Sequence, residues 1–441
     1  MFERCRTSGT RGCLSGTVLA LLLLMAVPVR AALPVTGAAA TPAYWLRADG
    51  DVPLLSAEEA AALNRQIAAH GDIHDLTASP ERLAGTEVRA RIAAAAQDLA
   101  GEELPGLYRG EQRLTAKTWQ EVRWNCALDA VGEIVTVRYA VAVQRADVRL
   151  LPTGDGWYES PGDVRYDSLQ GTVLDPGEAV LVLHSTRDGM FAFVESRDYL
   201  GWVDIRSLAL TDRETWRGFA APEEFFTVTV PQLRLYDAGR TLLYQLGAKI
   251  PGTYAAEGTM RLCIPVRDAG GHLRVREDAA VADGRLTPGR LPLTHNNLVR
   301  LAFAPLGTEY GWGGQNEGMD CSSYVQNVYR AMGVELPRDA DQQERACMRL
   351  PLAGLDTNAR AERLSGAPLG ALLFRPGHVM LYLGRDAGNI PLVIHDISSY
   401  YEDGEKRYMR QVVVSDLTFQ NARGEAAINT LDTIGLVAPR P

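Results

Sequence analysis

A glycine-rich, aromatic loop runs into a helical pattern in the stretch Tyr310-Gly-Trp-Gly-Gly-Gln-Asn-Glu-Gly-Met-Asp-Cys321-Ser-Ser-Tyr-Val-Gln-Asn-Val-Tyr-Arg-Ala-Met-Gly333. The apolar residues that follow the loop fall on one helical face: Tyr324, Val325, Val328, Tyr329 and Met332. Asp320 is a good N-cap, and Gly333 stands where a helix C-terminus favours glycine. The sequence therefore predicts a helix that begins at Cys321.

Cys321 is the candidate nucleophile of this chain. In the first turn of a helix, unpaired N–H groups and the helix dipole favour the thiolate, which is the reactive form of cysteine. The alternative is that Cys321 is a small buried hydrophobic residue, which is the ordinary role of a free cysteine. The glycine-rich approach and the helix-start position favour the catalytic interpretation.

Length and composition limit the kind of protein. The 441 residues exceed one compact core, so two to four domains are expected. The chain is 46% hydrophobic and 22% charged, which is ordinary for a folded soluble protein. A net charge of -9 argues against a general nucleic-acid binder, which normally carries a basic stripe.

The first 31 residues have the pattern of an export signal. Arg4, Arg6 and Arg11 precede an apolar run over 17–27, and Val29-Arg30-Ala31 resembles a small-residue cleavage site. The apolar run is short for a membrane span, so we expect no stable span after cleavage. An uncleaved anchor is the alternative.

The remaining chain divides into four parts. Residues 32–125 are alanine-rich and mostly helical, with a capping box at Ser56 and helices expected over about 56–69 and 85–99. Short β-type runs separated by turn residues predict one small barrel over 126–211 and a second over 212–285. Residues 286–441 mix helix and strand, which indicates an α+β domain. The four cysteines after the signal have no zinc-site spacing, so no metal or cofactor is predicted.

Two histidines follow Cys321 in the same block. His378 begins a strand after the turn at Arg375-Pro-Gly377, and His395 ends the next strand. Cysteine catalysis needs a base near the thiol and a group that orients the base. We therefore assign His378 as the base and His395 as the orienting residue. Buried histidines with structural hydrogen bonds are the alternative for either one alone.

The ordered motifs of this block resemble the NlpC-type cysteine peptidases of bacterial cell walls. The matching elements are Tyr310-x-Trp-Gly-Gly, Asp320-Cys-Ser322, Leu336-Pro-Arg-Asp339 with Gln343, Gly377-His-Val379 with Tyr382-Leu-Gly384, and Ile394-His395. The resemblance implies a multidomain α+β protein: a papain-like C-terminal peptidase domain preceded by two SH3-like barrels and a helical N-terminal segment. That architecture is similar to the γ-D-glutamyl-L-diamino-acid endopeptidases.

The resemblance also implies a substrate and residue roles. These enzymes cleave peptidoglycan stem peptides of the type L-Ala-γ-D-Glu-diamino acid. Cys321 would attack the γ-glutamyl carbonyl, with its own N–H and the Tyr310 hydroxyl holding the oxyanion. Asp320 would pair with a free L-alanine amine. The remaining expected substrate-binding residues are Trp312, Ser322, Arg338, Asp339 and, from the first barrel, Tyr166.

Several alternatives stay open at this stage. Asp320 can be a plain N-cap, and Arg338 and Asp339 can be a local ion pair. Ser323 and Ala340 depart from the family pattern, in which Gly and Ser are usual. The chain can also be a peptidoglycan-binding protein with an inactive domain, or an amidase or transpeptidase on the same fold.

Overall fold

The computed structural model describes residues 33–96, 106–237, 239–254, 259–281 and 283–437. The predicted export signal over 1–31 lies outside these ranges, as do residues 97–99 of the second expected N-terminal helix. Within the described ranges, no helix is long and apolar enough to cross a membrane.

In its described residues, the N-terminal segment has four α-helices and three very short strands. The helices are α1 (Pro42–Trp45), α2 (Ala57–Ala68), α3 (Gly85–Ala95) and α4 (Ala116–Asn125); the strands are β1 (Arg82–Ala84), β2 (Tyr108–Arg109) and β3 (Gln112–Arg113). The predicted capping box is confirmed, because the Ser56 side chain accepts from the N–H of Glu59 and the Glu59 carboxylate accepts from the N–H of Ser56.

This segment does not form a core of its own. Trp45 of α1 and Ile67 of α2 are buried with residues of the C-terminal domain, whereas Val88 of α3 and Trp119 of α4 are buried with the first barrel. Short helices with few apolar residues gain most of their stability by packing on a neighbour. The segment therefore braces two different domains.

The first barrel is a seven-stranded antiparallel sheet with strand order β11-β5-β8-β9-β10-β6-β7. Its strands are β5 (Arg138–Ala142), β6 (Ala146–Arg149), β7 (Gln170–Leu174), β8 (Ala179–Ser185), β9 (Phe191–Glu195), β10 (Leu200–Asp204) and β11 (Leu208–Thr211); β4 (Ile134–Thr136) pairs with β1. Trp157 and Trp202 are completely buried in its core. A long loop over residues 150–169 connects β6 to β7.

The boundary between the two barrels differs from the prediction. Helix α5 (Arg213–Ala220), assigned from the sequence to the second barrel, buries Trp216 in the core of the first, and the Trp216 indole donates to the carbonyl of Val180. This amphipathic helix packs its apolar face against the first barrel. The boundary was predicted from the spacing of the strands, which carries no information on where a helix packs.

The second barrel has a five-stranded sheet, order β17-β16-β15-β12-β18, and a separate β13-β14 pair. The strands are β12 (Phe225–Val228), β13 (Gln232–Asp237), β14 (Arg240–Gln245), β15 (Lys249–Tyr254), β16 (Thr259–Arg267), β17 (Leu273–Val281) and β18 (Leu286–Pro288). The last strand lies beyond the predicted boundary at 285, and it belongs to this barrel because it pairs with β12.

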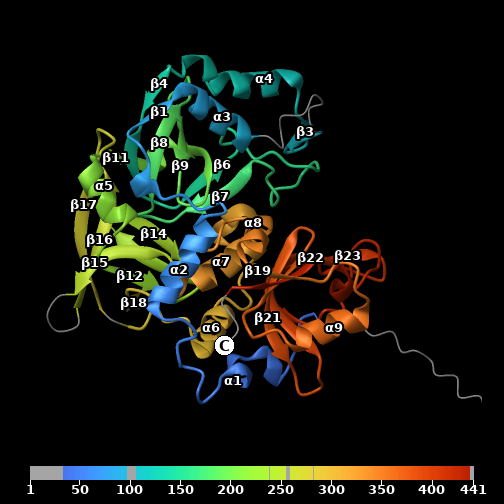
Figure 1. Cartoon of the computed structure of the whole chain (residues 1–441). Coiled ribbons are helices and arrows are strands. Elements are labelled where there is room, and N and C mark those ends of the chain that lie inside the picture. The colour runs from blue at the N-terminus through green and yellow to red at the C-terminus, as the bar shows by residue number, and fades with distance from the viewer. Residues whose placement is uncertain (1–32, 97–105, 238, 255–258, 282, 438–441) are drawn as a thin grey trace, which may run out of the picture. The chain divides into compact units, whose positions relative to one another are not determined.

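The C-terminal domain has helices on both faces of a six-stranded sheet with order β19-β24-β20-β21-β22-β23 (Figure 1). Helix α7 packs against β21 and β22 from one side, and α9 packs against the same strands. The elements are α6 (His295–Phe303), α7 (Cys321–Ala331), α8 (Ala340–Ala346), α9 (Thr357–Ser365), β19 (Met348–Pro351), β20 (Leu372–Arg375), β21 (His378–Arg385), β22 (Pro391–Glu402), β23 (Glu405–Ser415) and β24 (Thr433–Leu436). Two separate apolar cores, one around α7 and one around α9, fill the two faces.

Two sequence predictions for this domain have different outcomes. The helix does begin at Cys321, with Asp320 as its N-cap, and His378 does begin a strand. His395 does not end its strand, because β22 continues to Glu402 and forms a long hairpin with β23. The polar residues after His395 are read as a loop in sequence, but cross-strand pairing keeps them extended.

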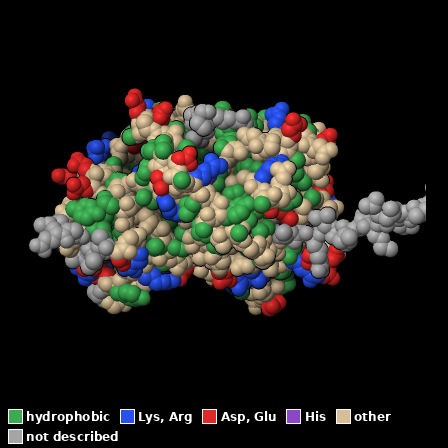
Figure 2. Space-filling model, turned by 90° about the horizontal axis from the view of Figure 1, so that it is seen from below, with side chains coloured by type: hydrophobic (Ala, Val, Ile, Leu, Met, Phe, Trp, Pro, Cys, Tyr) green, Lys and Arg blue, Asp and Glu red, His purple; other side chains and the backbone are tan. Residues whose placement is uncertain are grey.

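Figure 2 shows acidic and basic side chains interspersed on the face that it draws, without a continuous basic stripe on that face.

Candidate active site

A large cavity of about 1490 Å³ lies over the start of α7. The glycine-rich loop, the start of α8, the turn before β21 and the β22–β23 hairpin line it, and so does the β6–β7 loop of the first barrel. Nine of the ten residues expected in the site line this cavity: Tyr166, Tyr310, Trp312, Asp320, Cys321, Ser322, Arg338, Asp339 and His378. The tenth, His395, is completely buried behind His378.

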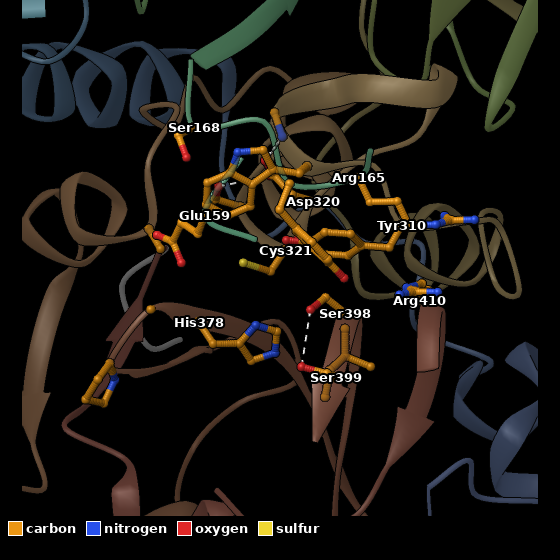
Figure 3. A pocket seen from close by; sticks show the side chains of 18 of the residues that line it. Glu159, Arg165, Ser168, Tyr310, Asp320, Cys321, His378, Ser398, Ser399 and Arg410 are labelled. Atoms are coloured by element: carbon orange, nitrogen blue, oxygen red, sulfur yellow. Dashed lines mark hydrogen bonds between the residues drawn. The ribbon is translucent and has the colours of Figure 1, made fainter. Parts of the chain in front are cut away.

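Cys321 and His378 point toward one another across the cavity floor (Figure 3). The first lies at the N-terminus of α7 and the second at the first position of β21, directly after the Arg375-Pro-Gly377 turn. Since Cys321 is the first residue of its helix, its N–H has no partner within the helix. The sulfur and a free N–H donor therefore face the same space.

A relay of two histidines stands behind the thiol. The Nε2 atom of His378 lies 2.7 Å from Nδ1 of His395, and Nε2 of His395 lies 2.9 Å from the Ser415 hydroxyl. If His395 donates from Nε2 to Ser415, its Nδ1 accepts the proton of His378 Nε2. The remaining nitrogen of His378, Nδ1, is then an unprotonated acceptor, which is the form that a general base needs.

Burial disfavours the charged forms of the Cys321 thiol and of both histidines. Burial raises the pKa of the Cys321 thiol to about 12, helped by the charge of Asp320, while a hydrogen bond from the Val379 N–H acts in the opposite direction. Burial lowers the pKa of His378 to about 3 and that of His395 well below its usual value. Desolvation therefore opposes the thiolate that the helix N-terminus favours.

Asp320 is the centre of a buried ion-pair cluster. Its two oxygens accept from Arg338 at 3.1 and 2.7 Å, and both residues are almost fully buried. The carboxylate accepts three further hydrogen bonds, from the N–H of Gly313 at 3.0 Å, the N–H of Ser323 at 2.9 Å and the hydroxyl of Ser322 at 3.2 Å. An ionised carboxylate has about four acceptor positions, so little capacity remains for a ligand.

Arg338 therefore does not form the local pair with Asp339 considered from the sequence. Its guanidinium turns toward Asp320, and its Nε atom donates to the Thr172 hydroxyl of the first barrel at 2.8 Å. Asp339 faces the cavity instead, and burial raises its pKa to about 6.

The glycine-rich loop fastens the site to the first barrel. Gly313 has φ 56°, and a Cβ there would lie 2.6 Å from Cγ of Gln170. The amide of Gln170 donates to the carbonyl of Gly313 at 3.1 Å, and the Trp312 indole donates to the carbonyl of Asp167 at 3.1 Å. The barrel backbone approaches so closely that glycine is required there.

The first barrel also contributes aromatic and acidic groups. Tyr166 lines the cavity, and its ring lies 6.5 Å from those of both Tyr310 and Trp312. Glu159 and Arg165 come from the same loop and line the cavity. Arg165 belongs to the stretch 163–167 that the sequence suggests as a wall of the pocket, whereas Glu159 was not expected there. Its position seven residues before Tyr166 is the signal that could have identified it.

Comparisons with known proteins agree with this geometry. Residues 307–417 match the model of the NlpC/P60 family, and residues 157–204 match that of the SH3 domain of SH3b1 type. The C-terminal block is an NlpC/P60 domain. The resemblance predicted from the motifs is confirmed, as is the multidomain α+β architecture with an SH3-like domain before the NlpC/P60 domain.

One solved structure extends the likeness over most of the fold. The structure of an NlpC/P60 endopeptidase from Photobacterium damselae subsp. piscicida covers 92% of this chain and 98% of its own, with a TM-score of 0.75 at 18% identity, which shows a shared fold. An NlpC/P60 family protein from Bacillus cereus covers 68% of this chain and 100% of its own at 19% identity, with a TM-score of 0.48. Dipeptidyl-peptidase 6 of Lysinibacillus sphaericus is 38% identical over 90 residues. That match spans 20% of this chain and 29% of the relative.

The described residues offer no obvious metal site. Within those ranges there is no group of three or more His, Cys, Asp or Glu side chains placed to hold a metal ion. Cys126, Cys263, Cys321 and Cys347 are all free thiols, so Cys321 is not engaged in a disulfide.

Proposed function

We propose that this protein is an exported cysteine endopeptidase that hydrolyses the γ-D-glutamyl-L-diamino-acid bond of peptidoglycan stem peptides. The observation that carries the proposal is the arrangement of Cys321 and His378 at the floor of a cavity, with His395 buried behind His378 and the first barrel forming one wall. The NlpC/P60 domain and the SH3-like domain support a peptidoglycan substrate.

The reaction proceeds through an acyl-enzyme. The Cys321 thiol transfers its proton to Nδ1 of His378 as the sulfur attacks the γ-carbonyl carbon. The Cys321 N–H and the Tyr310 hydroxyl stabilise the oxyanion. His378 then gives its proton to the leaving amine of the diamino acid, and a water molecule, deprotonated by the same histidine, hydrolyses the thioester.

Proton transfer fits the neutral resting pair. Because burial raises the pKa of the thiol to about 12 and lowers that of His378 to about 3, the neutral pair is favoured over the ion pair before substrate arrives. His395 accepts from the Nε2 proton of His378, so it keeps the correct tautomer and stabilises the imidazolium as it forms.

The free amine of the substrate needs a carboxylate with spare capacity. Asp320, the residue expected from the resemblance, is saturated by five donors and serves as the N-cap and as the partner of Arg338. We assign the amine to Asp339, whose carboxylate lines the cavity next to this cluster, with Glu159 as a second acidic group from the first barrel.

The barrel wall favours small, already released peptides. Arg165 of the wall forms an ion pair with Glu309 of the C-terminal domain at 2.5 Å, and Trp312 bonds to the barrel backbone. These two contacts hold the barrel loop against the C-terminal domain. A cavity closed in this way leaves less room for a glycan-linked stem peptide than an open groove would. This favours peptides with a free L-alanine amine.

A synthetic tripeptide assay tests the proposal. Wild-type protein is expected to release the diamino acid from L-Ala-γ-D-Glu-diaminopimelate, and Cys321→Ala is expected to release none. N-acetylation of the alanine is expected to lower kcat/KM by at least about tenfold, because a buried charged pair is lost. Full activity of Cys321→Ala would refute the mechanism, while equal rates on both peptides would refute only the amine requirement. Intact sacculi that bind without turnover would favour the inactive-domain alternative.

A further inference from the structure

Strand β23 carries two cations and an aromatic ring on one wall of the cavity. The guanidinium of Arg410 lies 4.1 Å from the ring centroid of Tyr408, and Nζ of Lys406 lies 5.2 Å from the same centroid. These three residues alternate along the strand and line the cavity. We call them the β23 wall.

The charges of the β23 wall are not neutralised within the protein. Across the described ranges, neither Lys406 nor Arg410 has a carboxylate at ion-pair distance, and the buried Nε atom of Arg410 has no hydrogen-bond partner. Arg407, between them, does pair with Glu402 and Glu405. Unpaired cations beside a cavity favour anionic ligands.

Arg410 is fixed with respect to the reacting groups. Its carbonyl accepts from the N–H of Tyr310 at 3.0 Å, and its backbone has φ 52°, a left-handed conformation that non-glycine residues seldom adopt. This backbone conformation accompanies the register shift between β22 and β23 after Ile397.

The cavity is electrically polarised about Cys321. In Figure 3, Glu159 lies on one side of Cys321, and Arg165 and Arg410 lie on the other side, next to Tyr310. Arg165 is already paired with Glu309, which leaves the β23 wall as the source of free positive charge at that end. A peptide with an amine at one end and carboxylates at the other fits in one direction only.

We propose that the β23 wall binds carboxylate groups on the leaving half of the substrate and so selects the diamino acid. The inference rests on the proposed function and adds the residues that bind the diamino acid. Diaminopimelate carries two carboxyl groups, whereas lysine carries one, and amidation removes the charge of either. Lys406 and Arg410 are specificity residues; they do not take part in the bond-making steps.

The α-carboxylate of D-glutamate is a second anionic group of the substrate that could bind the same cations. The α-carboxylate of D-glutamate belongs to the acyl half, so it remains with Cys321 after the first step. The two sources are separated by amidating one carboxylate at a time, because only the group that contacts the wall makes the rate sensitive to Lys406 and Arg410.

The test compares four peptides: L-Ala-γ-D-Glu-diaminopimelate, its side-chain amide on diaminopimelate, its α-amide on D-glutamate, and L-Ala-γ-D-Glu-L-Lys. The kcat/KM of the wild-type protein is expected to fall about tenfold on losing a diaminopimelate carboxylate, as for one charge-assisted hydrogen bond. Arg410→Gln and Lys406→Gln are expected to reduce this preference to within about twofold, and Arg410→Lys to restore part of it.

Arg407→Gln is the matched control on the same strand, and it is expected to keep the wild-type preference. Calorimetry with Cys321→Ala measures the affinity of each of the four peptides, and therefore the contribution of the β23 wall to binding, in the absence of turnover. Preference in binding without any cleavage would refute the proposed function and support the wall. Cleavage with equal rates on diaminopimelate and lysine, or a preference unchanged in Arg410→Gln, would overturn the inference. Sensitivity to the D-glutamate amide alone would also overturn it, since the wall would then read the acyl half.

Discussion

The Nε2 atom of His378 lies 2.7 Å from the Nδ1 atom of His395, although seventeen residues separate them in the chain. The first begins β21 and the second lies within β22, and these strands pair antiparallel. In the proposed mechanism this contact sets the tautomer and the orientation of His378, and the first prediction follows from it.

Replacement of His395 by Ala is expected to lower kcat by about 10²-fold or more with little change in KM, since an orienting group acts mainly in the transition state. Steady-state kinetics on the diaminopimelate tripeptide measure this. Ser415→Ala is the matched control: it removes the outer hydrogen bond of His395 and is expected to cost less than about tenfold. A kcat of His395→Ala equal to that of the wild type would remove the orienting role.

The thiol of Cys321 is expected to react slowly with alkylating agents at neutral pH. Its raised pKa of about 12 leaves almost no thiolate at pH 7, so the alkylation rate should rise about tenfold per pH unit as the pH increases toward that value. Mass spectrometry of the Cys321 peptide after timed iodoacetamide treatment reads the rate. Cys347, whose pKa burial also raises to about 12, is the internal control outside the cavity. Rapid neutral-pH labelling of Cys321 would contradict the neutral resting pair.

The pH profile of kcat/KM should report Asp339. Burial raises its pKa to about 6, with Asp320, Asp341 and Asp198 adding to the shift and Arg338 opposing it. Below that pH the carboxyl is neutral and cannot pair with the ammonium group, so kcat/KM rises as the pH increases through about 6. It falls again above about 8, where a peptide α-amine loses its proton.

Asp339→Asn is expected to lower kcat/KM and to abolish the acid limb of this profile. The N-acetylated peptide should show neither limb with wild-type protein. The base His378 does not produce a limb near neutrality, because its lowered pKa of about 3 keeps it unprotonated throughout. If the acid limb of the kcat/KM profile persists in Asp339→Asn, a group other than Asp339 produces it.

Removal of Arg338 should destabilise the protein as well as inactivate it. Arg338→Gln leaves the buried Asp320 without its bidentate partner, which typically costs about 3–5 kcal/mol. The midpoint of urea unfolding measures the loss. Arg345→Gln is the control, since Arg345 forms exposed ion pairs with Asp341 and Asp72, and such pairs contribute under about 1 kcal/mol. Equal midpoints for the two variants would show that the Asp320–Arg338 pair is not structural.

Local patterns predicted the elements that carry the chemistry. The helix from Cys321, its Asp320 cap and the strand start at His378 all follow from short-range rules of capping, periodicity and turns. The ordered motifs indicated the NlpC/P60 domain and the SH3-like domain, which the comparisons confirm. The predicted boundary between the two barrels was wrong because α5 packs on the first barrel. Which barrel a helix packs on depends on tertiary contacts, and the residues next to it in sequence do not show this.

The amino-acid sequence alone was enough to name the candidate reacting residues and to place Cys321 at a helix start and His378 at a strand start, because such starts are local properties. The electrostatic state of these residues and their partners depend on the folded structure. Burial, a property of the whole fold, makes the Cys321 thiol neutral despite its helix start, and Arg338 occupies Asp320 so that Asp339 is left facing the cavity. The β23 wall likewise exists only because the β22–β23 hairpin folds back over the site.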